Sequence, residues 1–90
     1  MKIAHPLPLV VVVWDDAWVR ADEPLVLNEV SASHKPMTVH TIGWLLMEDE
    51  RGVSVANEFY EETYRGRTFI PRAMVRTVTK FALAKPRKKR

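Results

Sequence analysis

The chain has 90 residues, the size of one small domain. It contains no cysteine, which excludes disulfides, thiolate nucleophiles and thiolate metal sites. The net charge of +3 is unevenly spread, because residues 85–90 carry five of the basic side chains and no acidic one, which leaves about −2 for the preceding residues. We therefore expect one domain over residues 1–84, followed by a basic, disordered tail over residues 85–90.

An apolar run over residues 7–13 predicts a strand, because it is rich in valine and too short for a stable helix. The run does not alternate with polar residues, which is typical of a strand covered on both faces. In a domain this small, we expect a second copy to cover one face or to pair with the strand edge to edge, with an oligomer interface at Leu9, Val10, Val11, Val12 and Val13. The run is too short to span a bilayer and its flanks are unlike a signal peptide, so we expect a cytoplasmic protein with no membrane partner.

Residues 19–37 carry the weakest signals. Pro24 and the apolar residues after it, through residue 30, are compatible with either a short helical turn or a hairpin arm, and residues 31–36 read as a surface loop. The pattern becomes clearly β from residue 38. It predicts a strand over 40–47, a charged turn over 48–52, an alternating strand over 53–56 and a polar hairpin loop over 60–66 that turns at Arg65–Gly66.

Three residues in this region carry structural expectations. Gly43 interrupts an apolar strand, which predicts either a sharp bend or a close backbone neighbour. Trp44 is expected to fill the core. Pro71 cannot donate to a sheet ladder, so it predicts one 3₁₀ turn over residues 71–74, before a final strand over 75–81. Together these signals predict an all-β fold, a small five-stranded and strongly bent barrel with a 3₁₀ turn before the last strand.

The order strand, Ile70-Pro71-Arg72-Ala73-Met74-Val75, strand resembles Sm-like and Src-homology-like small barrels, as does the bent strand, acidic turn and strand over residues 43–56. The chain is also similar to short proteins of bacteriophage and prophage genomes. The motifs that carry this similarity are Val11-Val12-Val13-Trp14-Asp15-Asp16-Ala17, Thr41-Ile42-Gly43-Trp44-Leu45, Glu48-Asp49 and Phe69-Ile70-Pro71-Arg72. The Sm-like resemblance implies ring assembly and RNA binding, and the phage resemblance implies the host cell cytoplasm.

Catalytic chemistry has little support. Asp15 and Asp16 are adjacent, and neighbours in an extended chain point to opposite faces rather than converging on one bond. His5, His34 and His40 lack the spacing of metal ligands. We therefore expect no catalytic site, no metal and no cofactor, and a hydrolytic enzyme is a distant third hypothesis.

Two functions remain. The leading hypothesis is a non-enzymatic interaction module of phage origin, a small homo-oligomer that binds a phage or host protein. The alternative is an Sm-like protein that binds RNA or single-stranded DNA, because aromatic and basic residues interleave near the last hairpin and the tail offers further phosphate contacts. Its expected binding residues are Tyr64, Arg65, Arg67, Arg72, Lys85, Arg87, Lys88, Lys89 and Arg90.

Overall fold

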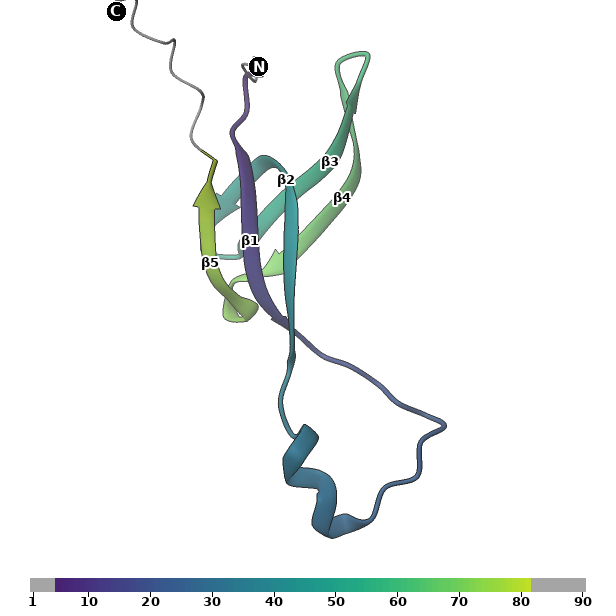
Figure 1. Cartoon of the computed structure of the whole chain (residues 1–90). Helices are drawn as coiled ribbons and strands as arrows, with labels where there is room; N and C mark the ends of the chain where they lie inside the picture. The colour runs from purple at the N-terminus through teal and green to yellow at the C-terminus, as the bar shows by residue number, and fades with distance from the viewer. Residues whose placement is uncertain (1–4, 82–90) are drawn as a thin grey trace, which may run out of the picture.

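The computed structural model describes residues 5–81, and in that part of the chain the fold is all-β, as predicted (Figure 1). Two short 3₁₀ helices accompany five strands. The strands are β1 (Leu9–Asp16), β2 (Met37–Asp49), β3 (Gly52–Tyr60), β4 (Thr63–Pro71) and β5 (Val75–Lys80), and the 3₁₀ helices are η1 (Leu27–Ser33) and η2 (Arg72–Met74). The predicted basic tail at 85–90 lies outside the described residues.

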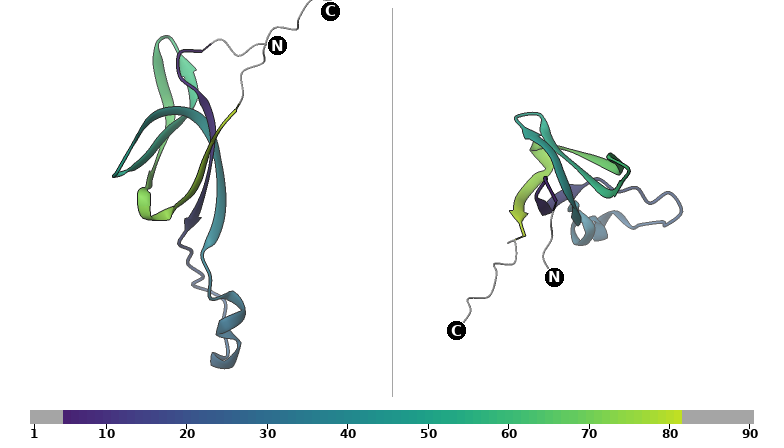
Figure 2. Two further views of the ribbon diagram at one scale, coloured as in Figure 1. Left: turned by 90° about the vertical axis from the view of Figure 1, so that its left-hand side faces the viewer. Right: turned by 90° about the horizontal axis from the view of Figure 1, so that it is seen from above.

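All five strands form one antiparallel sheet in the order β4-β3-β2-β1-β5. The sheet is strongly coiled (Figure 2). Within residues 5–81 it is not closed, because β4 and β5 are its outer strands and do not pair with each other. The predicted barrel is therefore not confirmed, although the strand count and the 3₁₀ turn after Pro71 are confirmed.

β2 is bent where the sequence predicted it. Its first part pairs with β1 as far as Trp44, and from Trp44 onward it pairs with β3, with a register shift between Leu45 and Met47. A side chain on Gly43 would place its Cβ only 2.6 Å from the carbonyl oxygen of Ala56. The glycine therefore permits a close approach of the β3 backbone where β2 changes from pairing with β1 to pairing with β3.

The core lies between the two halves of the coiled sheet. Its fully buried side chains are aliphatic and small, and Trp14, Leu45, Val75 and Val78 pack against them. The buried set is Val10, Val12, Val53, Val55, Ala56 and Ile70. Trp44 is only half-buried, so its predicted core position is wrong. It pairs with Leu9 and stacks on His5 instead, with ring centroids 4.0 Å apart.

The β3–β4 hairpin turns four residues earlier than expected. Tyr60 pairs with Thr63, so the loop consists of Glu61 and Glu62, and both have positive φ, 48° and 63°. This is the two-residue hairpin geometry that usually selects asparagine or glycine, and neither is present to signal it. The predicted loop over 60–66 is wrong, because Thr63 to Gly66 belong to β4. Gly66 does have positive φ, 66°, and a side chain there would collide with that of Asn57.

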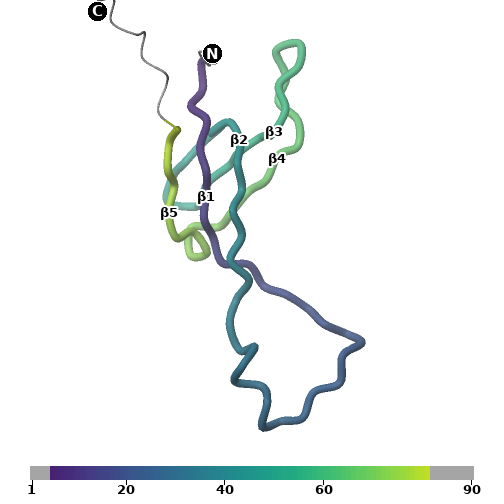
Figure 3. The backbone as a smooth tube through the Cα atoms, viewed as in Figure 1, coloured from purple at the N-terminus to yellow at the C-terminus, as the bar shows by residue number. Residues whose placement is uncertain are grey.

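The segment between β1 and β2, residues 17–36, is called the arm here. It leaves the sheet after Asp16 and returns at Met37, which pair with each other. Figure 3 traces it as an open loop beyond the ends of β1 and β2. Its helical part is the 3₁₀ helix η1, which extends through Ser31–Ser33, where a surface loop was expected. Among the described residues, no helix is long and apolar enough to cross a membrane.

Candidate interaction surfaces

The side chains of β1, which was predicted to form the oligomer interface, lie in two rows on opposite faces of the sheet. Successive side chains of a strand point to opposite faces. Val10 and Val12 have no exposed surface and belong to the core, so their predicted place in an interface is wrong. Leu9, Val11 and Val13 remain partly exposed on the other face. β1 also lies between β2 and β5, so it has no free edge for pairing with another copy.

The exposed row of β1 is part of a larger apolar surface. Residues paired across antiparallel strands share a face. Val11 pairs with Ile42 of β2, whose side chain is 55% exposed, and with Thr79 of β5, while Val13 pairs with His40 and Thr77. We call this surface the outer face: Leu9, Val11, Val13, His40, Ile42, Thr77 and Thr79.

The outer face contains no formally charged residue, and the nearest ion pair lies at its border. There the Arg76 Nε atom is 2.9 Å from Oδ1 of Asp15, and Thr38 donates a hydrogen bond to the same carboxylate. An apolar centre with charged residues at its border is the arrangement that protein interfaces favour. The outer face therefore has the composition of an interface core.

The arm carries a second exposed apolar surface. Val19 is 89% exposed and Leu27 is 86% exposed, and Leu25 and Val26 are also more than half exposed. Exposed apolar residues that gather in one segment point to an interaction rather than to a solvated loop. Sequence reasoning missed this surface, although the run from Leu25 to Leu27 beside Pro24 was a visible signal.

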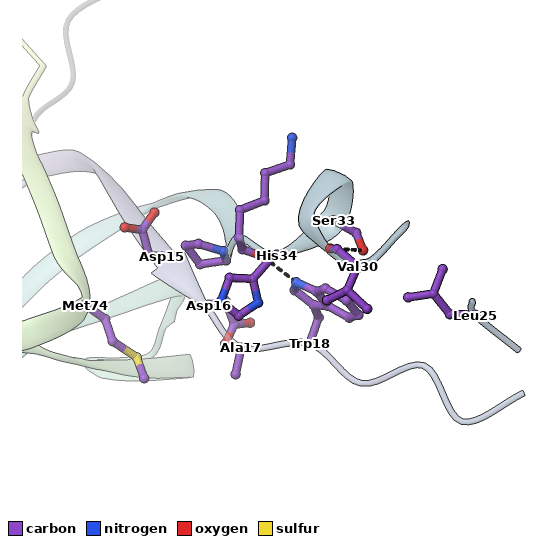
Figure 4. Close-up of a pocket in the computed structure, with 11 residues that line it drawn as sticks. Asp15, Asp16, Ala17, Trp18, Leu25, Val30, Ser33, His34 and Met74 are labelled. Carbon is purple, nitrogen blue, oxygen red and sulfur yellow. Dashed lines mark hydrogen bonds between the residues drawn. The ribbon is translucent and has the colours of Figure 1, made fainter. Parts of the chain in front are cut away.

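The base of the arm is ordered by Trp18. Its Nε1 donates a 2.7 Å hydrogen bond to the carbonyl oxygen of Lys35, and the Arg20 guanidinium lies 4.9 Å from its ring centroid. An open cavity of about 590 Å³ lies beside it, and Figure 4 shows Met74 at its sheet side and Leu25 at its far side. These contacts tie the two limbs of the arm together close to the sheet.

Tyr64 was predicted to stack on bases, and the structure places it elsewhere. It is half-buried against Phe59, and its hydroxyl lies 3.3 Å from Nε2 of His5. His5 in turn accepts a hydrogen bond at Nδ1 from the backbone N–H of Leu7 and stacks on Trp44. Tyr64 thus helps to fix the segment that leads into β1, and its ring is not a free platform.

Two of the predicted arginines are held by other side chains or by the backbone. Arg72 donates to the carbonyl oxygen of Asp49 at 2.7 and 3.2 Å, which anchors η2 to the β2–β3 turn. Arg65 lies 3.8 Å from Glu58 and 5.4 Å from the ring centroid of Tyr60. The structure therefore does not bring Arg65, Arg67 and Arg72 together as one basic surface.

Arg67 differs from the other two. With Arg65 and Phe69 it occupies alternate positions on the outer strand β4, so the three side chains share a face. A shallow cavity of about 230 Å³ lies between Arg67, Phe69, Ser54 and Thr68. The predicted tail residues Lys85, Arg87, Lys88, Lys89 and Arg90 lie outside the described residues.

The tightest charge contact joins Asp49 and Arg51 in the β2–β3 turn. Arg51 donates to the carboxylate through Nη2 at 2.8 Å, through Nε at 3.1 Å and through its backbone N–H at 2.9 Å. These hydrogen bonds hold the pKa of Asp49 below its ordinary value of 3.8, and they raise the pKa of Arg51. The pair stabilises the β2–β3 turn.

Possible metal ligands do not cluster in the described part of the chain. Between residues 5 and 81, no three His, Cys, Asp or Glu side chains gather in a way that could hold a metal ion. Asp15 is engaged by Arg76 and Thr38. No protein-family model, curated protein or solved structure matches the chain, so its function has to be argued from these surfaces.

Proposed function

We propose that the protein is a non-enzymatic interaction module that forms a small homo-oligomer through its outer face. The observation that carries this proposal is the division of β1, in which Val10 and Val12 are fully buried while Val11 and its partner Ile42 leave apolar surface in water. Burying apolar area contributes about 25 cal/mol per Å², so covering this face is favourable. The strand order and η2 support a barrel-like fold of the Sm-like or Src-homology-like kind, and the resemblance to phage proteins supports a phage or host protein as a further partner.

The test replaces an outer-face side chain with a charged one. Ile42→Lys should reduce the sedimentation-equilibrium mass to that of the monomer, because a lysine would be desolvated in the interface. Phe69→Lys is the matched control, since Phe69 is similarly exposed, 57% against 55%, and lies on the distant strand β4. Circular dichroism checks that both variants fold. A wild-type chain that sediments as a monomer at micromolar concentration, or an Ile42→Lys variant that stays oligomeric, contradicts the proposal.

Single-stranded nucleic acid is the second candidate partner. The alternation of Arg65, Arg67 and Phe69 along β4 favours it, because cationic and stacking groups in one row suit a flexible strand. Fluorescence anisotropy with a mixed-sequence RNA or DNA oligonucleotide at two salt concentrations tests this candidate. Loss of binding in Arg67→Gln assigns it to β4, and loss on truncation after Ala84 assigns it to the tail. If the full chain does not bind at low salt, this candidate is excluded.

A further inference from the structure

We infer that the arm of one copy packs on the outer face of a second copy, and that the second arm does the same in return. This inference rests on the proposed function, because it names what covers the outer face. Both surfaces are apolar and both belong to the same chain, so two copies can cover each other reciprocally. Such a two-fold arrangement closes on itself and ends at a dimer.

The arm does not bury its own apolar residues. In the described part of the chain, no residue of η1 is buried and none of residues 17–36 belongs to the core. Val19 and Leu27 leave nearly their whole side chains in water. Trp18 and Lys35 nevertheless hold the base of the arm in a defined shape. A segment that has a defined shape but leaves its apolar side chains exposed is expected to bind another surface.

The arm cannot cover the outer face of its own chain. Asp16 pairs with Met37, so both limbs leave the sheet at its end, and Figures 1 and 3 show the arm continuing beyond β1 and β2 rather than folding back over them. A second copy is therefore needed. Length is sufficient, because one limb of about ten residues can extend about 33 Å, whereas the row from Leu9 to Val13 is about 13 Å long.

Both charge and buried area favour a contact between the arm of one copy and the outer face of another over a contact between two arms or between two outer faces. The arm has two basic and three acidic side chains and thus one net negative charge, so two arms would repel each other weakly, whereas the outer face has no formal charge. A stable dimer buries about 800 Å² on each partner. The partly exposed side chains of the outer face are too few to supply that area alone, and the arm supplies the remainder.

The absence of cysteine from the chain allows a clean cross-linking test. Under mild oxidation, a mixture of the Val11→Cys and Leu27→Cys variants should give a disulfide-linked heterodimer as its main product. Neither variant alone should cross-link efficiently. Phe69→Cys mixed with Leu27→Cys is the matched control and should remain uncross-linked. A Val11→Cys variant that cross-links with itself would overturn the arm inference while leaving the proposed outer-face oligomer intact.

Removal of the arm provides an independent measurement. Residues 17–36 are replaced by Asn-Gly, a two-residue turn that suits the Asp16–Met37 pair. The sheet should still fold, because none of its described core residues comes from the arm. We expect the sedimentation mass to shift from dimer to monomer. A shortened chain that remains dimeric overturns the inference, and Ile42→Lys then shows separately whether the outer face is used.

Discussion

Replacing Gly43 with alanine tests the close approach of β2 and β3 directly. The added Cβ would lie 2.6 Å from the carbonyl oxygen of Ala56 and 3.1 Å from its carbonyl carbon. Ordinary carbon–oxygen contacts between strands are about 3.3–3.6 Å, so the two strands would have to separate by most of an ångström. Overpacking of this kind costs about 1–3 kcal/mol, and a weakened ladder hydrogen bond adds about 1 kcal/mol.

One opposing effect has to be subtracted. Alanine restricts the unfolded chain more than glycine does, which stabilises the protein by about 0.4–1 kcal/mol. The steric effect is larger, so we expect a net loss of about 1–3 kcal/mol and a melting temperature lower by roughly 5–20 °C. Urea denaturation followed by circular dichroism gives the free energy of unfolding. Ala56→Gly should not rescue the variant, because the obstructing atom belongs to the backbone. Equal or greater stability of Gly43→Ala would refute the reasoning.

Three further outcomes can be checked by the same unfolding measurement. Arg72→Ala should lower the free energy of unfolding by about 1 kcal/mol, since it removes donors to the Asp49 carbonyl. Arg67→Ala should change the free energy of unfolding by no more than about 0.5 kcal/mol, and equal losses in the two variants would contradict this. His5→Ala and Trp44→Ala should show a coupling of about 0.5–1.5 kcal/mol in a double-mutant cycle, and strict additivity would exclude a stabilising stack. The pKa of Asp49 is depressed below 3.8 in the fold, so its contribution to the free energy of unfolding is present above about pH 3.8 and is lost as the pH falls through the folded-state pKa. If the difference in unfolding free energy between the wild type and Asp49→Asn is the same in acid as at neutral pH, this reasoning is wrong.

Much of the fold could be predicted because its signals are local. Gly43, Pro71 and the alternation after Gly52 each restrict the backbone at their own position, and the structure has the bend, the 3₁₀ turn and the strand there. The hairpin turn at Glu61–Glu62 could not be predicted in this way. Positive φ is imposed there by the pairing of β3 with β4, against the preference of glutamate, so the neighbouring Gly66 attracted the prediction instead.

The candidate surfaces depend on which strands become neighbours, and the sequence shows this less directly. The run from Leu9 to Val13 indicated two covered faces, but only pairing with β2 and β5 reveals that Val10 and Val12 face the core while Val11 meets Ile42. Trp44 was expected inside for its size. It lies on the other face instead, because it pairs with Leu9, and the core is filled by valines and Ile70.

The pairing of β1 with β5 has a consequence for how the protein folds. Val12 pairs with Val78, so strands distant in sequence must meet before the core is covered on that side. Contacts of such long sequence separation slow folding, because the intervening chain must be ordered before they form. During synthesis, Val10 and Val12 emerge from the ribosome well before β5. Until β5 arrives, the nascent chain holds a valine-rich strand with one edge unpaired, the stage at which it is most exposed to misassembly and most in need of a chaperone.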